Sequence, residues 1–507
     1  MAPSAAEIES IVTRAVPRSS RRSTDSLRRM LTGLDDGEAG GNEEVLKKLC
    51  ALGVDYGRRE LERAVRSELL ERTSKKAQAN LRRALQHTLQ WITRPCLELE
   101  WTSYTMAMAA LRLGKMDASL AKQKFLGKQP RQRLFALFKR FPALAASWSV
   151  AINQWRNHVA EILERASKDE REIARAFFGS AAGGRIKDVR LGLSDRHLDG
   201  RSVALVEFEN GRVIYKPRSG RSEAEWASLL RWMNEHGFEP RLKEARSLRR
   251  KDYHWMENID PDTCRDVAAV RRFFERLGGL IAAAYLLNAV DCHRENLIAS
   301  GEEPVLVDTD ALWHVSSTTR AQSAEALLYR TGFFPNADRT SLQSRSSVLG
   351  KTRTGTHLPR IGARCESAAE YADQIIQGFE KGWNCLLGKP RNRAAFLRRQ
   401  RRIRGQQRRW IYRATASYAA IIRASLQPSA LTSAEARHDL IRRSLARNPG
   451  GAAVFNAEIQ ALEQLDIPYF LRRADARVGF VAASPPAELA RAIGQALATG
   501  KTVRKRS

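Results

Sequence analysis

The sequence has few of the features that mark secreted, zinc-binding or membrane-spanning proteins. Its six cysteines are widely separated, and no two of them stand at the C-x-x-C spacing of a zinc site. This pattern predicts free thiols in a reducing compartment. The N-terminus has no apolar signal segment, and the longest apolar run, residues 277–290, is too short to cross a bilayer. We therefore expect a cytoplasmic protein without a membrane span.

Acidic residues are scarce relative to basic ones. The chain has 56 Asp and Glu against 86 Lys and Arg, a formal net charge of +30. Such an excess predicts a polyanionic partner, whether nucleic acid, nucleotide phosphates, an acidic peptide or an anionic membrane. Aromatic residues make up only 7%, and no nucleic-acid-binding module is recognisable, so we expect no nucleic acid partner. The 43% of hydrophobic residues excludes global disorder.

The hydrophobic pattern and the composition predict an α+β protein with several parts. Helical periodicity dominates the first third, strands and turns appear after residue 180, and basic helical segments follow residue 366. We expect five consecutive segments: a flexible basic lead-in at 1–45, a helical domain at 46–180, a catalytic core at 181–365, a helical basic region at 366–475 and a C-terminal tail at 476–507.

A hairpin is predicted at the start of the core. Two β-rich runs, 203–209 and 212–216, flank Asn210-Gly211. Asn-Gly between such runs favours a type I′ turn, in which both central residues have positive φ. Pro217 should end the second strand, because it cannot donate to a ladder. Lys216 would then stand at the end of a strand.

Three segments together carry a pattern typical of phosphoryl transfer. Asn296 follows Asp291 by five residues, and Asp308 follows Asn296 by twelve, directly after a short apolar strand at 304–307. Kinases space a catalytic Asp, a metal-binding Asn and a metal-binding Asp in this way, with a strand Lys upstream. Each of these residues, considered alone, also has a purely structural interpretation. Asp291 and Asn296 suit a helix-end turn, His293 a structural hydrogen bond, and Lys216 a solvated strand end. No glycine-rich G-x-G-x-x-G segment is present.

Several motifs in one order resemble the dehydratase part of the class II (LanM-type) lanthipeptide synthetases, across roughly residues 90–475. The matching segments are 141–144 (FPAL), 195–203 (DRHLDGRSV), 214–219 (IYKPRS), 253–257 (YHWME), 291–299 (DCHRENLIA), 304–308 (PVLVD), 409–418 (RWIYRATASY) and 466–470 (DIPYF). The resemblance implies a lipid-kinase-like bilobal core at 181–365, with large helical additions at both ends, in a bacterial cytoplasmic enzyme.

The resemblance also implies a reaction and its residues. Such enzymes phosphorylate Ser and Thr of a ribosomally made precursor peptide with ATP and Mg²⁺, then eliminate the phosphate to leave dehydroalanine or dehydrobutyrine. The precursor carries a leader segment, and a separate cyclase protein is a further expected partner. The residues that match the phosphorylation site are Asp291, His293 and Asn296, with Asp308 and Asp310 near the metal and Lys216 near the nucleotide. The residues that match the elimination site are Asp195, His197, Arg409 and Thr415.

The sequence also departs from the family pattern. It ends about 37 residues after Phe470 and has no Cys-His-Gly zinc signature, so we expect neither ring closure nor zinc. Asp310 stands where the family usually has Glu, which places its carboxylate one methylene further back. Two other interpretations stay open: a peptide kinase that does not eliminate the phosphate, and a degenerate, non-catalytic basic protein that binds peptide or nucleic acid.

Overall fold

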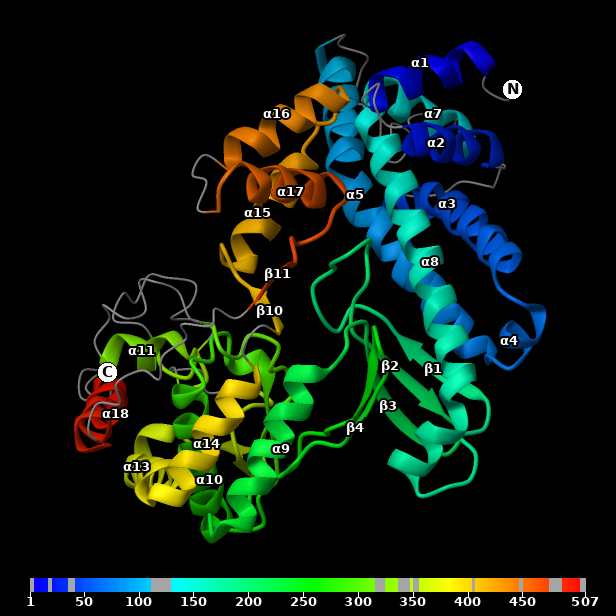
Figure 1. Ribbon diagram of the computed structural model, residues 1–507. Coiled ribbons are helices and arrows are strands. Elements are labelled where there is room, and N and C mark those ends of the chain that lie inside the picture. Colours follow the sequence, from blue (N-terminus) through cyan, green and yellow to red (C-terminus); the bar gives the residue numbers. More distant parts are fainter. Residues whose placement is uncertain are drawn as a thin grey trace. The chain divides into compact units, whose positions relative to one another are not determined.

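The computed structural model describes residues 4–16, 21–34, 42–110, 129–314, 324–335, 347–349, 355–403, 406–445, 450–473 and 486–501. Helices and short strands are mixed along the chain, which confirms the predicted α+β class. Two compact units divide the chain (Figure 1): the first is Met1–Pro217 with Tyr412–Pro468, and the second is Arg218–Ile411 with Tyr469–Ser507. Each unit is therefore built from two separate stretches of the chain. The five consecutive segments expected from composition do not show this arrangement.

Two long helices form the framework of the first unit. Helices α5 (Lys75–Ala110) and α8 (Pro142–Ile173) run side by side (Figure 1). Pro142 begins α8 at a position where its missing N–H costs no hydrogen bond. Trp148 is fully buried, and its indole N–H donates to Thr93 Oγ1 over 2.8 Å. Around this pair lie α3 (Asn42–Ala64), α4 (Ser67–Glu71), α7 (Pro130–Arg140) and the π-helical turn η1 (Ala174–Phe178).

The N-terminal segment differs from the flexible lead-in that its composition predicts. Residues Ala5–Ala15 form α1 and Arg21–Gly33 form α2, and both helices contact α8. Their apolar side chains recur at helical spacing and are buried against it, as Ile11 and Leu27 show. The prediction failed because it used the composition of residues 1–45, which contains many arginines, and not the spacing of the apolar residues. The glycine-rich stretch at 37–41 lies outside the described residues.

The predicted hairpin is present, but its turn is not the predicted one. Strand β2 (Ala204–Phe208) pairs antiparallel with β3 (Gly211–Lys216), and β1 (Ile186–Arg190) pairs with β2. Phe208 faces Gly211, so Glu209 and Asn210 make the turn, and neither Asn210 nor Gly211 has a positive φ. The type I′ prediction was therefore wrong. Glycine is required at 211 because a Cβ there would collide with the ring of Phe178.

Among its described residues, the second passage through the first unit contains three short helices, α15 (Thr415–Ser425), α16 (Ala434–Ser444) and α17 (Ala452–Glu463). A fully buried carboxylate, Glu458 of α17, joins α17 to α15 and to Arg413, which lies just before α15. It accepts hydrogen bonds from Arg413 Nε (2.8 Å) and from the Tyr418 hydroxyl (2.6 Å). These hydrogen bonds offset part of the cost of burying the carboxyl group.

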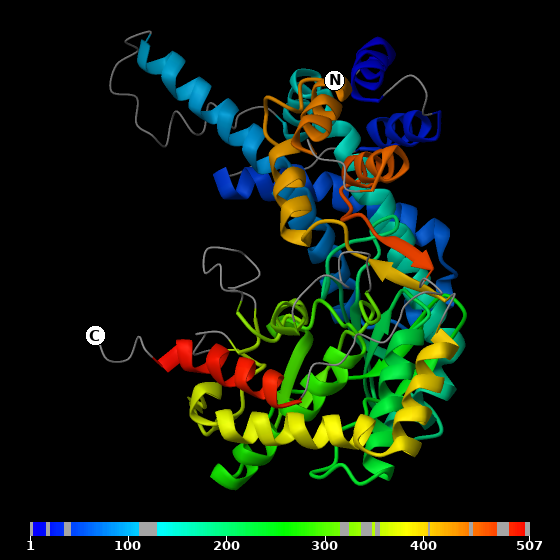
Figure 2. The same cartoon turned by 60° about the vertical axis from the view of Figure 1, so that its left-hand side comes forward.

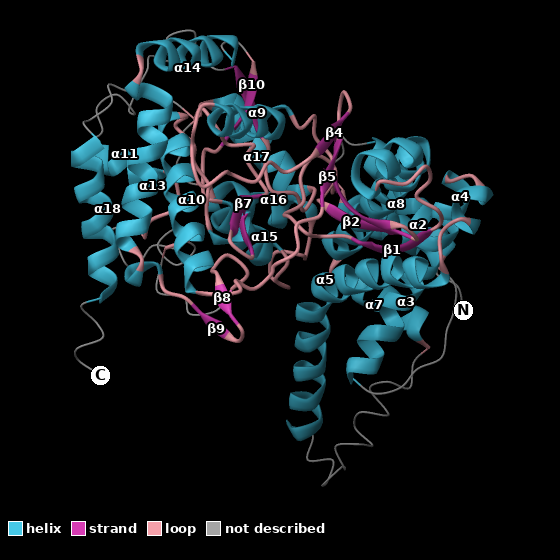
Figure 3. Cartoon of the chain, turned by 90° about the horizontal axis from the view of Figure 1, so that it is seen from below, coloured by secondary structure: helices cyan, strands magenta, loops and turns pink. Residues whose placement is uncertain are grey.

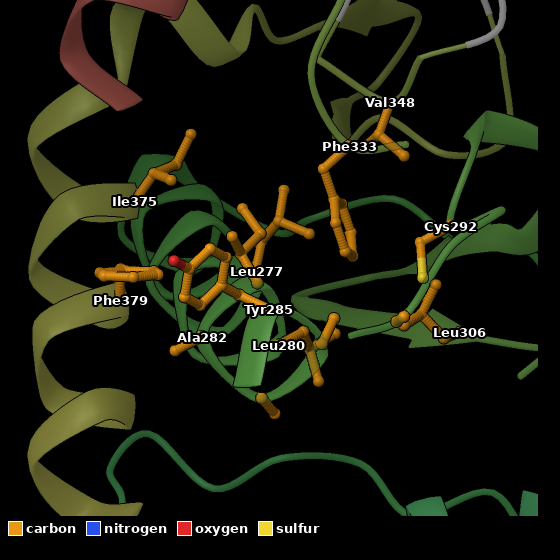
Figure 4. Packing of buried hydrophobic residues seen from close by; sticks show 14 of the residues in the cluster. Leu277, Leu280, Ala282, Tyr285, Cys292, Leu306, Phe333, Val348, Ile375 and Phe379 are labelled. Carbon is orange, nitrogen blue, oxygen red and sulfur yellow. The ribbon is translucent and has the colours of Figure 1, made fainter. Parts of the chain in front are cut away.

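The core of the second unit lies between α10 (Val267–Leu286) and α13 (Ala372–Trp383). Figure 4 shows Ile375 and Phe379 of α13 facing Leu277 and Ala282 of α10. The helix backbones touch where Gly278 meets Gly378, since a Cβ on either glycine would collide with the backbone of the other helix. The end of α10 leads into the segment at 291–296.

Short strands and further helices complete the second unit. Helix α9 (Arg221–Glu235) precedes the antiparallel pair β4 (Ser247–Arg249) and β5 (His254–Glu257). Strands β6 (Leu297–Ser300) and β7 (Glu303–Leu306) pair antiparallel, as do β8 (Arg360–Ile361) with β9 (Arg364–Cys365), and β10 (Gln407–Trp410) with β11 (Phe470–Arg473). Further helices are α11 (Ala324–Arg330), η5 (Asn384–Gly388) and α14 (Pro390–Ile403), with single turns at η2 (Arg294–Asn296) and η4 (Ala368–Glu370).

The segment predicted as a C-terminal tail contains a packed helix. Helix α18 (Pro486–Lys501) lies along α13, as Figures 2 and 3 both show. Leu489 and Ile493 are fully buried in the core of the second unit. Among the described residues, no helix combines the length and the apolar character that crossing a bilayer requires.

Candidate active site

The segment after α10 is a tight loop closed by one of the predicted site residues. Asp291 has φ 68°, a left-handed conformation that is uncommon outside glycine and is found at functional sites. The side-chain amide Nδ2 of Asn296 donates to the Asp291 carbonyl over 2.8 Å. Because the nitrogen is used in this bond, the orientation of the amide is set, and Oδ1 is its acceptor atom.

His293 and Asp291 form a hydrogen-bonded pair within this loop. His293 Nδ1 accepts the backbone N–H of Glu295 (3.3 Å), so in the neutral ring the proton is on Nε2. Nε2 lies 3.3 Å from Asp291 Oδ1 and donates to it. Burial acts to raise the pKa of Asp291, but the His293 hydrogen bond and the Arg409 charge outweigh it and lower the pKa. Asp291 is therefore ionised at neutral pH.

Two carboxylates, Asp308 and Asp310, follow β7 and form ion pairs with arginines. Arg218 donates to Asp308 Oδ1 over 2.6 Å and lies 3.3 Å from Asp310 Oδ2. Arg409 lies 3.3 Å from Asp310 Oδ2 and 3.9 Å from Asp291 Oδ2. Arg409 thus links both predicted acidic segments. We call Arg218, Asp291, Asp308, Asp310 and Arg409 the arginine–carboxylate cluster; all five lie in the second unit.

Two further side chains support this cluster. Glu223 of α9 accepts from Arg218 over 2.9 Å, and the Arg409 guanidinium lies over the ring of Tyr469, 5.4 Å from its centroid. Burial works against both arginine charges, but the surrounding carboxylates raise the pKa of Arg218 and of Arg409 well above the ordinary value. Burial raises the pKa of Asp310, and its two arginine neighbours oppose that rise. The cluster therefore holds two permanent positive charges with little exposure to solvent.

The predicted metal ligands fit Mg²⁺ in chemical kind. Asp308, Asp310 and the Asn296 amide offer hard oxygen atoms, which Mg²⁺ prefers. In the part of the chain that the structure describes, no three acidic, histidine or cysteine side chains are gathered as a metal-binding group. Arg218 instead contacts both Asp308 and Asp310. The donor atoms thus match Mg²⁺ in kind alone, and in this structure Arg218 supplies the positive charge beside the two carboxylates.

The other predicted residues lie in the first unit. Asp195 is exposed in the loop after β1, Lys216 is buried at the end of β3, and Thr415 is the first residue of α15. His197 Nδ1 lies 2.7 Å from the carbonyl oxygen of Ile467. Since a carbonyl only accepts, Nδ1 carries the proton, and Nε2 holds the lone pair in the neutral ring. The two units thus divide the predicted residues, with only Arg409 of the elimination set in the second.

Reasoning from the sequence missed several supporting residues. Arg218 stands two positions after Lys216 in the same motif, and Asp466 begins the motif at 466–470, yet neither had been given a role. Glu161 accepts the Tyr215 hydroxyl (2.6 Å) and Arg201 Nε (2.8 Å), which joins the strand of Lys216 to the segment of His197. Only the place of Arg218 and Asp466 inside motifs could have drawn attention to them.

Comparison of the sequence with known protein families places the chain in one of them. The family described as a domain of unknown function, DUF4135, matches residues 141–361 and 336–473, which together cover more than half of the chain. The chain belongs to this family.

A curated relative adds a second comparison. The chain is similar to the lacticin 481/lactococcin biosynthesis protein LcnDR2 of Lactococcus lactis subsp. lactis, with 23% identity over 394 residues. The match covers 67% of this chain and 41% of the relative's length. Together the two matches confirm the resemblance to LanM-type proteins that the motifs indicated.

Proposed function

We propose that this protein modifies a ribosomally made precursor peptide in the bacterial cytoplasm, phosphorylating Ser and Thr with ATP and then eliminating the phosphate. The observation that carries the proposal is the arginine–carboxylate cluster, which gathers the kinase-spaced residues of two segments in one unit. The similarity to a protein named for lacticin 481 and lactococcin biosynthesis supports a role in modifying a precursor peptide. A kinase-like arrangement of the core is part of the proposal.

Phosphorylation needs an oriented hydroxyl and neutralised phosphate charge. Asp291, ionised and oriented by His293, would accept the hydrogen bond of the substrate hydroxyl and its proton. Asn296, Asp308 and Asp310 would hold Mg²⁺, which supplies charge neutralisation for the transferred phosphoryl group. Lys216 would bind the nucleotide phosphates. Arg218 and Arg409 add fixed positive charge beside the carboxylates.

Elimination needs a base at the α-proton and a cation for the departing phosphate. The base takes the proton from Cα, the electron pair forms the Cα–Cβ double bond, and the phosphate leaves with the C–O electrons. His197 Nε2 is suited to take this proton because Nδ1 already donates to Ile467. Arg409 and Thr415 would bind phosphate oxygens, and Asp195 would act beside His197.

The surplus positive charge suits the precursor as a partner. We propose that an acidic leader segment binds part of the surface that gives the chain its net charge of +30. Leader affinity should fall as salt rises; affinity that is insensitive to salt would contradict this assignment.

Intact-mass measurement after incubation with ATP, Mg²⁺ and the Ser/Thr-rich peptide encoded beside the gene tests the proposal. Loss of one water per modified residue is the expected result. Gain of phosphate without loss of water would reduce the function to that of a peptide kinase. No change in mass with a folded protein would contradict both activities and favour a non-catalytic binding protein.

A further inference from the structure

The turn that follows His197 has an unusual backbone. His197 and Arg201 exchange two backbone hydrogen bonds of 2.9 Å, and the three residues between them, Leu198, Asp199 and Gly200, have φ values of 50°, 67° and 78°. Left-handed backbone is costly for residues other than glycine, so two of these three positions are strained. Such a turn persists only when its surroundings hold it in place.

Asp466 provides that support from a distant part of the sequence. Its Oδ2 accepts the N–H of Asp199 over 2.7 Å, and both of its carboxylate oxygens lie 3.0 Å from the Gly200 nitrogen. Successive backbone N–H groups in a turn form a concave site for an anion. The Asp466 side chain is 4% exposed, so water competes little for these bonds.

The neighbouring residue fixes the histidine itself. The Ile467 N–H donates to the Arg196 carbonyl over 2.8 Å, and the Ile467 carbonyl accepts from His197 Nδ1. Gln154 packs against the turn at Gly200, where an added Cβ would lie 2.5 Å from the Cβ of Gln154. The side-chain amide of Gln154 donates to the Gln464 carbonyl over 2.7 Å. Asp466 and Ile467 thus bond directly to four residues of the turn, Arg196, His197, Asp199 and Gly200.

We propose that Asp466 is a positioning residue for His197 in phosphate elimination. Its carboxylate holds the left-handed turn, while the backbone carbonyl of the next residue, Ile467, keeps the proton of the neutral His197 ring on Nδ1. The inference rests on the proposed function of His197 as the base. Burial raises the pKa of Asp466 to about 6, so at neutral pH the turn is held by an ionised carboxylate kept in a buried place.

The test supplies a phosphorylated peptide, with ADP and Mg²⁺ present, so that elimination is measured without the kinase step. Asp466→Asn should lower kcat for elimination about 10- to 100-fold with KM unchanged, because a misplaced base loses alignment but not substrate contacts. Phosphorylation of the unmodified peptide should be unchanged. Asp466→Glu should recover part of kcat, which a general loss of packing would not allow. Asp439→Asn, an exposed acid in the same unit, is the matched control and should behave as wild type.

The possible results distinguish a failure of the role assigned to Asp466 from a failure of the proposed elimination activity. Wild-type protein that does not eliminate phosphate would overturn the proposed function. Wild-type protein that eliminates, together with a folded Asp466→Asn that eliminates equally fast, would overturn only the role of Asp466. If Asp466→Asn does not fold, Asp466→Ser replaces it, since the smaller side chain leaves room for water, and normal elimination by that variant would count against the proposal in the same way.

Discussion

In the second unit, acidic side chains are paired with arginine side chains; in the first unit, Asp466 is paired with backbone N–H groups. The arginine–carboxylate cluster brings permanent charges together, and its two arginines stay charged at any pH of interest. The Asp466 carboxylate instead fixes the shape of a turn and the ring of one histidine. The first arrangement suits charge stabilisation of a phosphoryl group, and the second suits exact placement of a base.

The largest expected effect comes from the charged cluster. Asp308→Asn removes a carboxylate that contacts Arg218 and is expected to hold the metal, so phosphorylation should fall about 10²- to 10³-fold. Neither phosphopeptide nor dehydrated peptide should accumulate in an intact-mass time course. Asp373→Asn, on an exposed position of α13, serves as the control. A folded Asp308→Asn that phosphorylates normally would remove Asp308 from the site.

Arg409→Ala should separate the two steps. Arg218 still contacts Asp310 in this variant, so phosphorylation should continue at a reduced rate. Elimination should fall about 10²-fold, because the leaving phosphate loses its arginine, and phosphopeptide should accumulate. The matched control is Arg401→Ala, which changes an exposed arginine of α14. Normal dehydration by a folded Arg409→Ala would leave Arg409 without a catalytic role.

Glu161→Gln tests the second support of the elimination loop. Loss of the charge weakens the bond to Arg201 and leaves the buried Tyr215 hydroxyl with a neutral acceptor. Elimination should fall about 10-fold, and the free energy of unfolding should drop by about 1–3 kcal/mol. Glu164→Gln, an exposed residue one turn further along α8, should change neither quantity. An unchanged elimination rate would show that Asp466 alone is sufficient to hold the loop.

The smallest expected effect is a pH dependence of stability. The folded pKa of Asp466 is about 6 and the unfolded value is about 4, so the folded state binds the proton more tightly. The stability of wild type relative to Asp466→Asn should therefore increase as pH falls from about 7 to about 4. Arg196 and Asp199 are the charged neighbours that act on the group. Thermal unfolding of both proteins across this range measures the difference, and a difference that is constant with pH would exclude a raised pKa.

The sequence predicted local features of the fold and site better than distant contacts. The hairpin at 203–216, the helix end near Asp291 and the strand before Asp308 follow from local sequence patterns, and the structure confirms each. Arg218 contacts Asp308 across 90 positions, and Asp466 contacts Asp199 across 267. No local pattern encodes such pairs. The type I′ turn at Asn210-Gly211 was predicted wrongly: the glycine at 211 makes room for the ring of Phe178, which is remote in sequence, and has no positive φ.

The central claim is that the charged cluster phosphorylates and the Asp466-supported turn places the base that eliminates. The most direct test is an intact-mass time course of His197→Ala with ATP, Mg²⁺ and the precursor peptide. The account predicts that phosphopeptide forms at the wild-type rate and accumulates without loss of water. Dehydrated peptide at the wild-type rate, or unmodified peptide from a folded variant, would contradict it.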